Sequence, residues 1–261
     1  MFIFEINFLT MYKCLFLGSK IIRLEEVDST NVYAANLIKS NLSSITEGTV
    51  IYTNNQTKGK GQRGNNWVSS PNENFTFSII LKPNLLVSEQ FLLSKICALG
   101  IFDFLTDLEI KNISIKWPND IYVGKQKIAG MLLENTLKNS KIEYCVAGIG
   151  INVNQTLFYN YLQQVTSLKL VTNKSFDINR LFNQLLFFIE KRYLQLKSNK
   201  IRELNKDYLN QLMGYNIKKT YLIKNQEVCG VIAGVATSGK LQLYYDNQLH
   251  EFDLKELKFV F

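Results

Sequence analysis

The sequence predicts an α+β fold in which a mixed sheet with helices is followed by a small all-β region. Strand-like and helix-like segments are mixed up to residue 213, whereas only short strand-like segments separated by polar turns follow Gly214. Several of these segments are close enough to form hairpins, which favours antiparallel pairing over a doubly wound parallel sheet. We therefore expect a larger domain over residues 1–213 and a smaller one over residues 214–261.

Capping residues and periodicity justify the first elements of the larger domain. Residues 21–27 are interpreted as a short strand, and the first 10–20 residues as an extension before the fold. Residues 28–31 (DSTN) all favour a helix N-cap, which predicts a helix over residues 32–40. Apolar and polar residues alternate over residues 75–81, which is typical of a half-buried strand.

Helical spacing and turn residues define the remaining elements. Leu92, Ile96 and Leu99 recur on one face of a helix predicted over residues 89–105. The larger domain is further predicted to contain strands at residues 48–53, 113–117, 120–123, 128–134 and 143–153 and helices at residues 181–196 and 202–213. The smaller domain is predicted to contain strands at residues 217–222, 227–235, 240–245 and 250–252.

The composition is that of a globular protein with a basic surface. The 261 residues are 46% hydrophobic and 20% charged, which excludes global disorder. The net charge of +8 is spread along the chain without a run of five like charges. A solvated basic surface is the simplest interpretation, and nucleic acid, an anionic ligand or an acidic protein partner are alternatives.

Cysteine and histidine usage excludes several kinds of site. Cys14, Cys97, Cys145 and Cys229 are far apart in apolar runs and form no C-x-x-C pair, so neither a zinc site nor a redox motif is supported. Buried free thiols in the cytoplasm are expected. The single histidine, His250, lies in a polar strand-like segment, so a nucleophile activated by histidine is disfavoured. No segment is apolar and long enough to span a bilayer.

The most informative segment is residues 56–67 (QTKGKGQRGNNW), in which three glycines alternate with three cations before a tryptophan. Glycines let a backbone approach a ligand, and amide groups beside Lys60 and Arg63 favour an anion. The G-x-G-x-x-G string is weak here, because a strand-like segment follows it instead of a helix. A flexible polar loop is the alternative, but the cations and Trp67 favour a loop that closes over phosphates.

A second group of candidate residues follows at residues 116–120 (KWPND). Asn119 is a candidate to bind phosphate or Mg²⁺, and Asp120 to orient a neighbour or the metal, although a simple turn is the alternative. Lys127 precedes an apolar strand, where Gly130 leaves space, and is a candidate to bind a carboxylate or an α-phosphate. These parts favour attack of a carboxylic acid on the α-phosphate of ATP, which needs cations, Mg²⁺ and backbone donors more than proton transfer.

Five motifs in order give the chain a resemblance to the biotin protein ligases. They are Ser29-Thr30-Asn31, residues 56–67, residues 116–120, residues 127–130 (KIAG) and residues 148–152 (GIGIN). The resemblance implies a class II synthetase-like catalytic domain followed by a small SH3-like β-barrel. It implies that biotin and MgATP give biotinyl-5′-AMP, from which a lysine of a biotin carboxyl carrier protein takes the biotinyl group.

The resemblance also implies which partners to expect. The carrier would belong to acetyl-CoA carboxylase or another biotin-dependent carboxylase, and the enzyme would be a cytoplasmic monomer or homodimer without a membrane partner. Bifunctional members of the family carry an N-terminal winged-helix domain that binds DNA. Only 28 residues precede Ser29, too few for such a domain, so no DNA partner is expected.

The resemblance assigns roles to individual residues. Lys127, Lys60 and Arg63 would be catalytic, and Asn119 and Asp120 would hold Mg²⁺. The implied biotin-binding residues are Ser29, Thr30, Asn31, Gln56, Lys60, Gly61, Gln62, Lys127, Gly130 and Gly148. The implied ATP-binding residues are Gly59, Lys60, Gly61, Gln62, Arg63, Trp67, Asn119, Lys127 and Asn152.

Two residues depart from the family pattern. Lys60 stands where the family usually has arginine, which replaces a two-pronged donor by a point charge. Gln62 stands where a second arginine is usual, and Arg63 follows it. Either Arg63 takes over retention of the adenylate or the enzyme releases its intermediate more readily.

Two alternative functions remain. A lipoate–protein ligase would resemble this chain in fold and chemistry, but the Gly-Gly-Gly segment with a nearby histidine that is typical of that family is missing. A basic nucleic-acid-binding module would instead predict salt-sensitive binding to generic nucleic acid.

Overall fold

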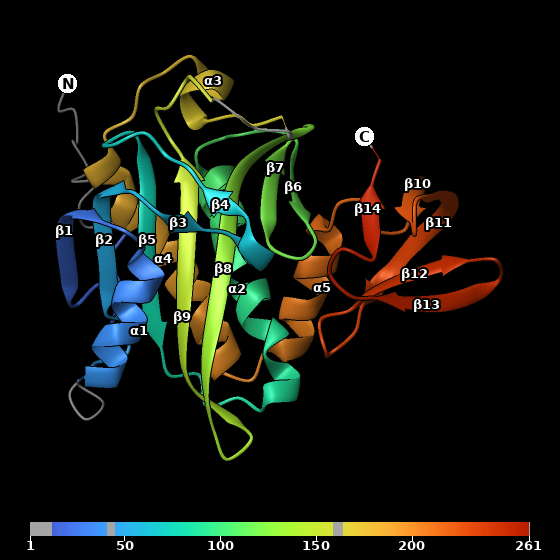
Figure 1. The fold of residues 1–261 in the computed structure, drawn as a ribbon, viewed down its shortest axis with the longest axis horizontal. Coiled ribbons are helices and arrows are strands. Elements are labelled where there is room, and N and C mark those ends of the chain that lie inside the picture. The colour runs from blue at the N-terminus through green and yellow to red at the C-terminus, as the bar shows by residue number, and fades with distance from the viewer. Residues whose placement is uncertain (1–11, 41–44, 159–163, 261) are drawn as a thin grey trace, which may run out of the picture.

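The computed structural model describes residues 12–40, 45–158 and 164–260. Its larger sheet has seven strands in the order β1-β2-β5-β9-β8-β7-β6 (Figure 1). Strands β1 and β2 pair in parallel and the other neighbouring pairs are antiparallel, so the sheet is mixed. The strands are β1 (Ile21–Val27), β2 (Val50–Gln56), β5 (Asn74–Leu81), β6 (Ile113–Lys116), β7 (Asp120–Val123), β8 (Gln126–Lys138) and β9 (Lys141–Asn152).

Helices cover both faces of this sheet. One face packs against α2 (Phe91–Asp107) and α4 (Ile178–Lys197), with α5 (Ile201–Gln211) beside α2 (Figure 1). The other face carries α1 (Thr30–Ser40) and a short hairpin that crosses in front of β9 and β8. The smaller elements are β3 (Gly59–Lys60), β4 (Asn66–Trp67), α3 (Leu168–Thr172) and the 3₁₀ turns Gln62–Gly64 and Val87–Glu89.

The central strand β5 separates the apolar core from the polar wall of the site. Its odd-numbered side chains face the large helices, where the Phe77 ring lies 5.0 Å from that of Phe182. Its even-numbered side chains Thr76 and Ser78 face the other way, where the first residues of α1 lie. Every residue of β5 is buried, so the prediction of a half-buried strand was wrong, because α1 covers the second face.

A five-stranded sheet follows, in the order β13-β12-β11-β10-β14. A hydrogen bond joins the turn after β6 to the turn after β11, where the Trp117 Nε1–H donates to the Gly239 carbonyl at 2.8 Å. The predicted α+β class with a small C-terminal β domain is confirmed, whereas the SH3-like barrel and the boundary at residues 213–214 stay predictions. The strands are β10 (Lys218–Ile223), β11 (Gln226–Val235), β12 (Leu241–Tyr245), β13 (Gln248–Phe252) and β14 (Leu257–Phe259).

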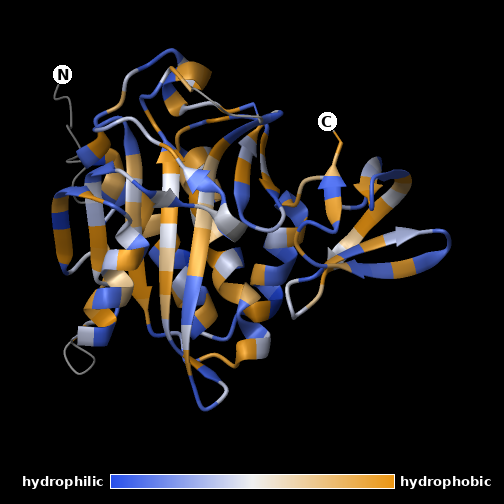
Figure 2. Cartoon of the chain, viewed as in Figure 1, coloured by the Kyte–Doolittle hydropathy of each residue, from blue (hydrophilic) through white to orange (hydrophobic). Residues whose placement is uncertain are grey.

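Hydropathy follows this architecture. Figure 2 shows hydrophobic residues concentrated on the central strands and the large helices, whereas the tip joining β8 to β9 is hydrophilic. Cys97 and Cys145 are buried, as predicted, but Cys14 is half-buried and Cys229 exposed, so the prediction of four buried thiols was wrong. Cys229 lies on β11, whose residues alternate between the two faces of a small sheet. Among the described residues, no helix is both long and apolar enough to cross a membrane.

Candidate functional site

A pocket of about 780 Å³ lies over β8 and β9, between the β3–β4 hairpin, the turn at residues 117–119 and strand β14. Most of the site residues predicted from the sequence line it. They are Ser29, Thr30, Asn31, Gln56, Lys60, Gly61, Gln62, Trp67, Asn119, Asp120, Lys127, Gly130 and Gly148. Ser29 and Gly148 line the same cavity although they are far apart in the chain. The fold therefore brings the five sequence motifs together at one site.

Two predicted residues, Asn152 and Gly59, stand apart from this lining. Asn152 is buried at the end of β9, where its side-chain amide donates to the Thr166 carbonyl at 3.0 Å. Gly59 pairs with Trp67 across the β3–β4 hairpin. Arg63 belongs to the 3₁₀ turn after Gly61, and its side chain lies outside the described part of the structure.

One end of the pocket is neutral and rich in hydrogen-bonding groups. The start of α1 supplies Thr30 and Asn31, both buried, and the end of β2 supplies Gln56. Gln56 Oε1 accepts from the Thr30 backbone N–H at 2.9 Å and lies 3.2 Å from Thr30 Oγ1. The side chains that line this end are uncharged, which suits a neutral polar group.

Glycines form the middle of the pocket floor. A Cβ on Gly148 would lie 2.2 Å from Asn31 Oδ1, so this glycine makes room for the asparagine that supports the neutral end. A Cβ on Gly150 would lie 2.3 Å from the Trp67 ring, and one on Gly130 would lie 3.2 Å from it. The indole therefore lies directly on the backbones of β8 and β9. Its Nε1–H is buried and has no hydrogen-bond partner among the described residues.

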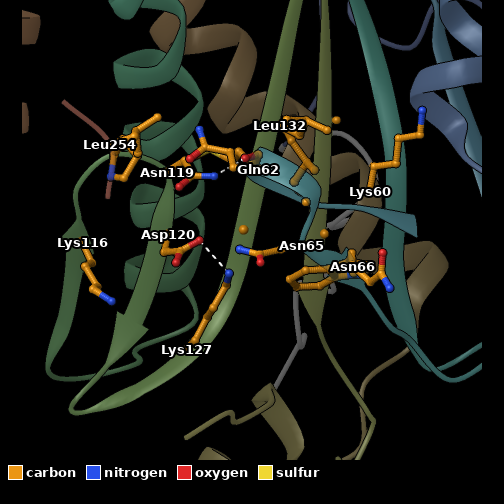
Figure 3. A pocket seen from close by; sticks show the side chains of 18 of the residues that line it. Lys60, Gln62, Asn65, Asn66, Lys116, Asn119, Asp120, Lys127, Leu132 and Leu254 are labelled. Carbon is orange, nitrogen blue, oxygen red and sulfur yellow. Dashed lines mark hydrogen bonds and ion pairs between the residues drawn. The ribbon is translucent and has the colours of Figure 1, made fainter. Parts of the chain in front are cut away.

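The opposite end of the pocket is cationic. Lys127 Nζ lies 2.7 Å from Asp120 Oδ1, and Figure 3 shows the two side chains pointing toward one another across β7 and β8. The same ammonium lies 5.7 Å from the centroid of the Trp67 ring. The Lys127 charge is thus held at the junction between the glycine floor and the cationic end.

Lys116 adds a second cation at this end. Its ammonium donates to the Tyr122 hydroxyl at 3.2 Å and lies 5.0 Å from the centroid of the same ring. Burial lowers the pKa of Lys116, an effect that Asp120 opposes and Lys127 reinforces. An anion entering this end would relieve the repulsion between the two lysines.

The glycine-rich loop borders the pocket without closing its whole length. The Gly61 N–H donates to the Asn65 carbonyl at 2.6 Å, which fixes the turn that presents Gln62 to the cavity. Lys60 is exposed, and Figure 3 shows its side chain far from Lys127 and turned outward. The two cations predicted to act together are therefore separated here.

The candidate metal ligands offer few protein oxygens. The Asn119 side-chain amide donates to the Met131 carbonyl at 2.5 Å, which leaves its Oδ1 as an acceptor. Asp120 is the neighbouring carboxylate, and no group of three His, Cys, Asp or Glu side chains forms a metal-binding cluster among the described residues. One carboxylate and one amide oxygen fit Mg²⁺ that is held largely by substrate phosphates and water.

Several lining residues escaped the sequence analysis. Gly150 lies two residues after Gly148 on β9, so the two glycines share one face of the strand. This spacing could have identified Gly150 from the sequence. Gln164 and strand β14 gave no such signal, because only the tertiary fold brings them to the cavity. The Gln164 carbonyl accepts from the Lys127 N–H at 2.9 Å, and β14 contributes Leu257, Lys258 and Phe259 to the lining.

Comparisons with known proteins agree with this geometry. Residues 24–152 match the model of the "Biotin/lipoate A/B protein ligase family". The chain is 26% identical over 230 residues to the bifunctional ligase/repressor BirA of Bacillus spizizenii, covering 87% of this chain and 70% of the relative. It is 26% identical over 232 residues to the biotin–[acetyl-CoA-carboxylase] ligase of Mycobacterium tuberculosis, covering 87% and 85% of the two chains.

A solved structure extends the likeness over most of the fold. The biotin protein ligase from Aquifex aeolicus in complex with biotin and ATP superposes with a TM-score of 0.73 at 25% identity, covering 92% of this chain and 98% of the other. These matches support a biotin protein ligase, and the chain is a ligase enzyme.

Proposed function

We propose that the enzyme activates biotin with ATP to biotinyl-5′-AMP and transfers the biotinyl group to a lysine of a biotin carboxyl carrier protein. The observation that carries this proposal is the chemical asymmetry of one pocket. A neutral, hydrogen-bonding end at Thr30 and Gln56 suits the cyclic urea of biotin, and a cationic end at Lys116 and Lys127 suits phosphates. The biotin carboxylate would then lie between them, where the glycine floor allows close approach.

In the first step a carboxylate oxygen of biotin forms a bond to the α-phosphorus of ATP, and the bond to the departing pyrophosphate breaks. Negative charge grows on the phosphoryl oxygens, and we assign its stabilisation to Lys127, whose ammonium lies at the cationic end of the pocket. Mg²⁺, when bound, neutralises phosphate charge, and Asn119 and Asp120 are the residues that would hold it. We assign Gly61 and Gln62 to shielding of the adenylate, and Trp67 to packing against it.

In the second step the amine of the carrier lysine attacks the carbonyl carbon of the mixed anhydride. An amide bond forms, the bond from the carbonyl carbon to the AMP oxygen breaks, and the amine loses a proton. AMP leaves as a phosphate monoester and needs no protonation to depart. The names of relatives such as the Paracoccus denitrificans biotin–[acetyl-CoA-carboxylase] ligase, 31% identical over 132 residues, support a carboxylase carrier as the acceptor.

The experiment that tests the proposal is pyrophosphate exchange into ATP, run in parallel with biotin, with lipoate and with neither acid. We expect exchange that requires biotin and Mg²⁺, followed by labelling of a purified carrier domain. Exchange with lipoate alone would assign the chain to lipoate ligation, which the family description also contains. Exchange with neither acid would contradict both assignments.

A further inference from the structure

Ser78 lies directly behind the neutral wall of the pocket and does not line it. Its side chain is fully buried in β5, opposite Gly148 of β9. Ser78 Oγ lies 2.6 Å from Asn31 Oδ1 and 2.7 Å from Thr30 Oγ1. One hydroxyl therefore joins two residues of the wall.

The orientation of the Asn31 amide follows from its other partners. Asn31 Nδ2 donates to the Leu132 carbonyl at 3.1 Å and to Glu134 Oε2 at 2.8 Å. A carbonyl and a carboxylate only accept hydrogen bonds, so the nitrogen must face them. Asn31 Oδ1 consequently faces Ser78, in the space that Gly148 leaves free.

The hydroxyl protons can then be assigned by counting. Asn31 Oδ1 can only accept a hydrogen bond, so the Ser78 hydroxyl must donate its single proton to it. The 2.7 Å contact between Ser78 and Thr30 is then a hydrogen bond in which the Thr30 hydroxyl donates and Ser78 Oγ accepts. The remaining contact, Thr30 Oγ1 to Gln56 Oε1, is 3.2 Å, beyond the usual range for a hydroxyl donor to an oxygen. Gln56 cannot turn its amide nitrogen inward, because its oxygen accepts from the Thr30 backbone N–H.

We propose that Ser78 is a positioning residue that makes this wall selective for a ligand carrying an N–H. Because Ser78 accepts the hydrogen bond of the Thr30 hydroxyl, Thr30 Oγ1 and Gln56 Oε1 lie 3.2 Å apart with no proton between them. An N–H of a cyclic urea can donate a hydrogen bond to these two oxygens, whereas a dithiolane ring has no hydrogen-bond donor. This inference rests on the proposed function and adds the reason why the pocket takes a urea.

The test is a comparison of two ligands in two proteins. We measure by calorimetry the affinity of wild type and of Ser78→Ala for biotin and for biotin methylated on both urea nitrogens. Without Ser78 the Thr30 hydroxyl turns to Gln56, so biotin affinity should fall about tenfold. The preference for biotin over the methylated ligand should shrink by the same factor, because the open acceptors are gone. The KM for ATP and the rate at saturating biotin should stay unchanged.

Controls separate positioning from a general structural role. Ser78→Thr retains the hydroxyl and should retain the preference, and Ser78→Cys replaces Ala if that variant does not fold. Thr49→Val removes a buried hydroxyl that donates to the Thr46 carbonyl outside the pocket, and should leave both affinities unchanged. Equal weakening of both ligands in Ser78→Ala would overturn the inference while leaving the proposed function intact. A wild type that binds neither ligand would overturn both.

Discussion

Lys127 is the residue on which most of the proposed site chemistry depends. Its side chain is 21% exposed and its ammonium lies 2.7 Å from Asp120 Oδ1, in a half-buried position where a charge is costly unless it is paired. The pair keeps the cation in place before substrate arrives, and an incoming carboxylate or phosphate can share it. A lysine at the start of a strand could be identified from the sequence. Its pairing with Asp120 could not, because it depends on the exact register of the β7–β8 hairpin, which shifts between Ile121 and Tyr122.

We expect Lys127→Ala to reduce adenylate formation at least ~100-fold, because the main fixed cation beside the reacting phosphate is lost. Biotin-dependent pyrophosphate exchange measures this step. Lys138→Ala, on the same strand with a 67% exposed side chain, should leave the rate near that of wild type. Near-normal exchange in a folded Lys127→Ala protein would refute the catalytic role.

A second residue-scale prediction concerns retention of the intermediate. Gln62 lines the pocket, so Gln62→Arg should add a charged donor to the adenylate phosphate and slow its release about tenfold. Rapid dilution of enzyme loaded with labelled biotinyl-adenylate gives the off-rate. Gln226→Arg adds the same charge at an exposed position of β11 and serves as the control. If both variants release the adenylate at the wild-type rate, an arginine at position 62 does not help this enzyme to retain its intermediate.

At the scale of elements, the floor of the site depends on glycines placed with the period of a strand. Gly148 and Gly150 point to the same face of β9, and Gly130 pairs with Gly150 from β8. The missing side chains admit Asn31 at one position and the Trp67 indole at the other two. The strands themselves were predictable from their apolar pattern, but the occupants of the spaces were not, because they arrive from α1 and from the β3–β4 hairpin.

We therefore expect Gly150→Ala to displace the Trp67 indole, since the new methyl group would lie 2.3 Å from its ring. Tryptophan emission should shift to longer wavelength as the ring becomes solvated, and kcat/KM should fall about 100-fold, as expected for misplacement near the reacting atoms. Gly234→Ala, where the nearest atom is the end of the Gln242 side chain at 3.1 Å, is the matched control. An unshifted emission spectrum would contradict the close packing.

The sequence predicted the longer elements and some short strands, but it missed several of the shortest elements. The segments at residues 21–27 and 120–123 form strands β1 and β7 with the predicted bounds. The two-residue strands β3 and β4, helix α3 and strand β14 were not predicted. Such short elements bury too little surface to leave a pattern, and they form because the neighbouring elements hold them.

At the scale of the whole molecule, a buried lysine lies where helices α2 and α5 meet. Lys95 is 6% exposed, and its ammonium donates to Asn205 Oδ1 at 2.7 Å. The rings of Phe91 and Tyr208 each lie 5.5 Å from it, and Phe91 also faces Gly239 of the C-terminal sheet. Burial lowers the pKa of Lys95 from its ordinary 10.5 to about 8. The contact between α2 and the C-terminal domain therefore lies beside a lysine whose burial disfavours its charged form.

This pKa shift predicts how stability depends on pH. Between pH 8 and 10.5 the folded protein has lost the Lys95 proton while the unfolded chain keeps it, so the contribution of Lys95 to the free energy of unfolding should rise across that window. Denaturant unfolding of wild type and Lys95→Met at several pH values measures the difference. Lys206→Met, at an exposed position of α5, should follow wild type. Parallel pH profiles for wild type and Lys95→Met would contradict the lowered pKa.

The sequence by itself predicted the resemblance to the biotin protein ligases, the α+β class and a group of the residues that line the pocket. It could do so because glycines, cations and capping residues have strong local preferences, and because their order along the chain is specific. Only the tertiary structure decided the hydrogen-bond direction through Ser78, the pairing of Lys127 with Asp120 and the approach of β14 to the cavity. The Lys127–Asp120 pair depends on the register of the β7–β8 hairpin, and the other two depend on packing between segments that are distant in the chain.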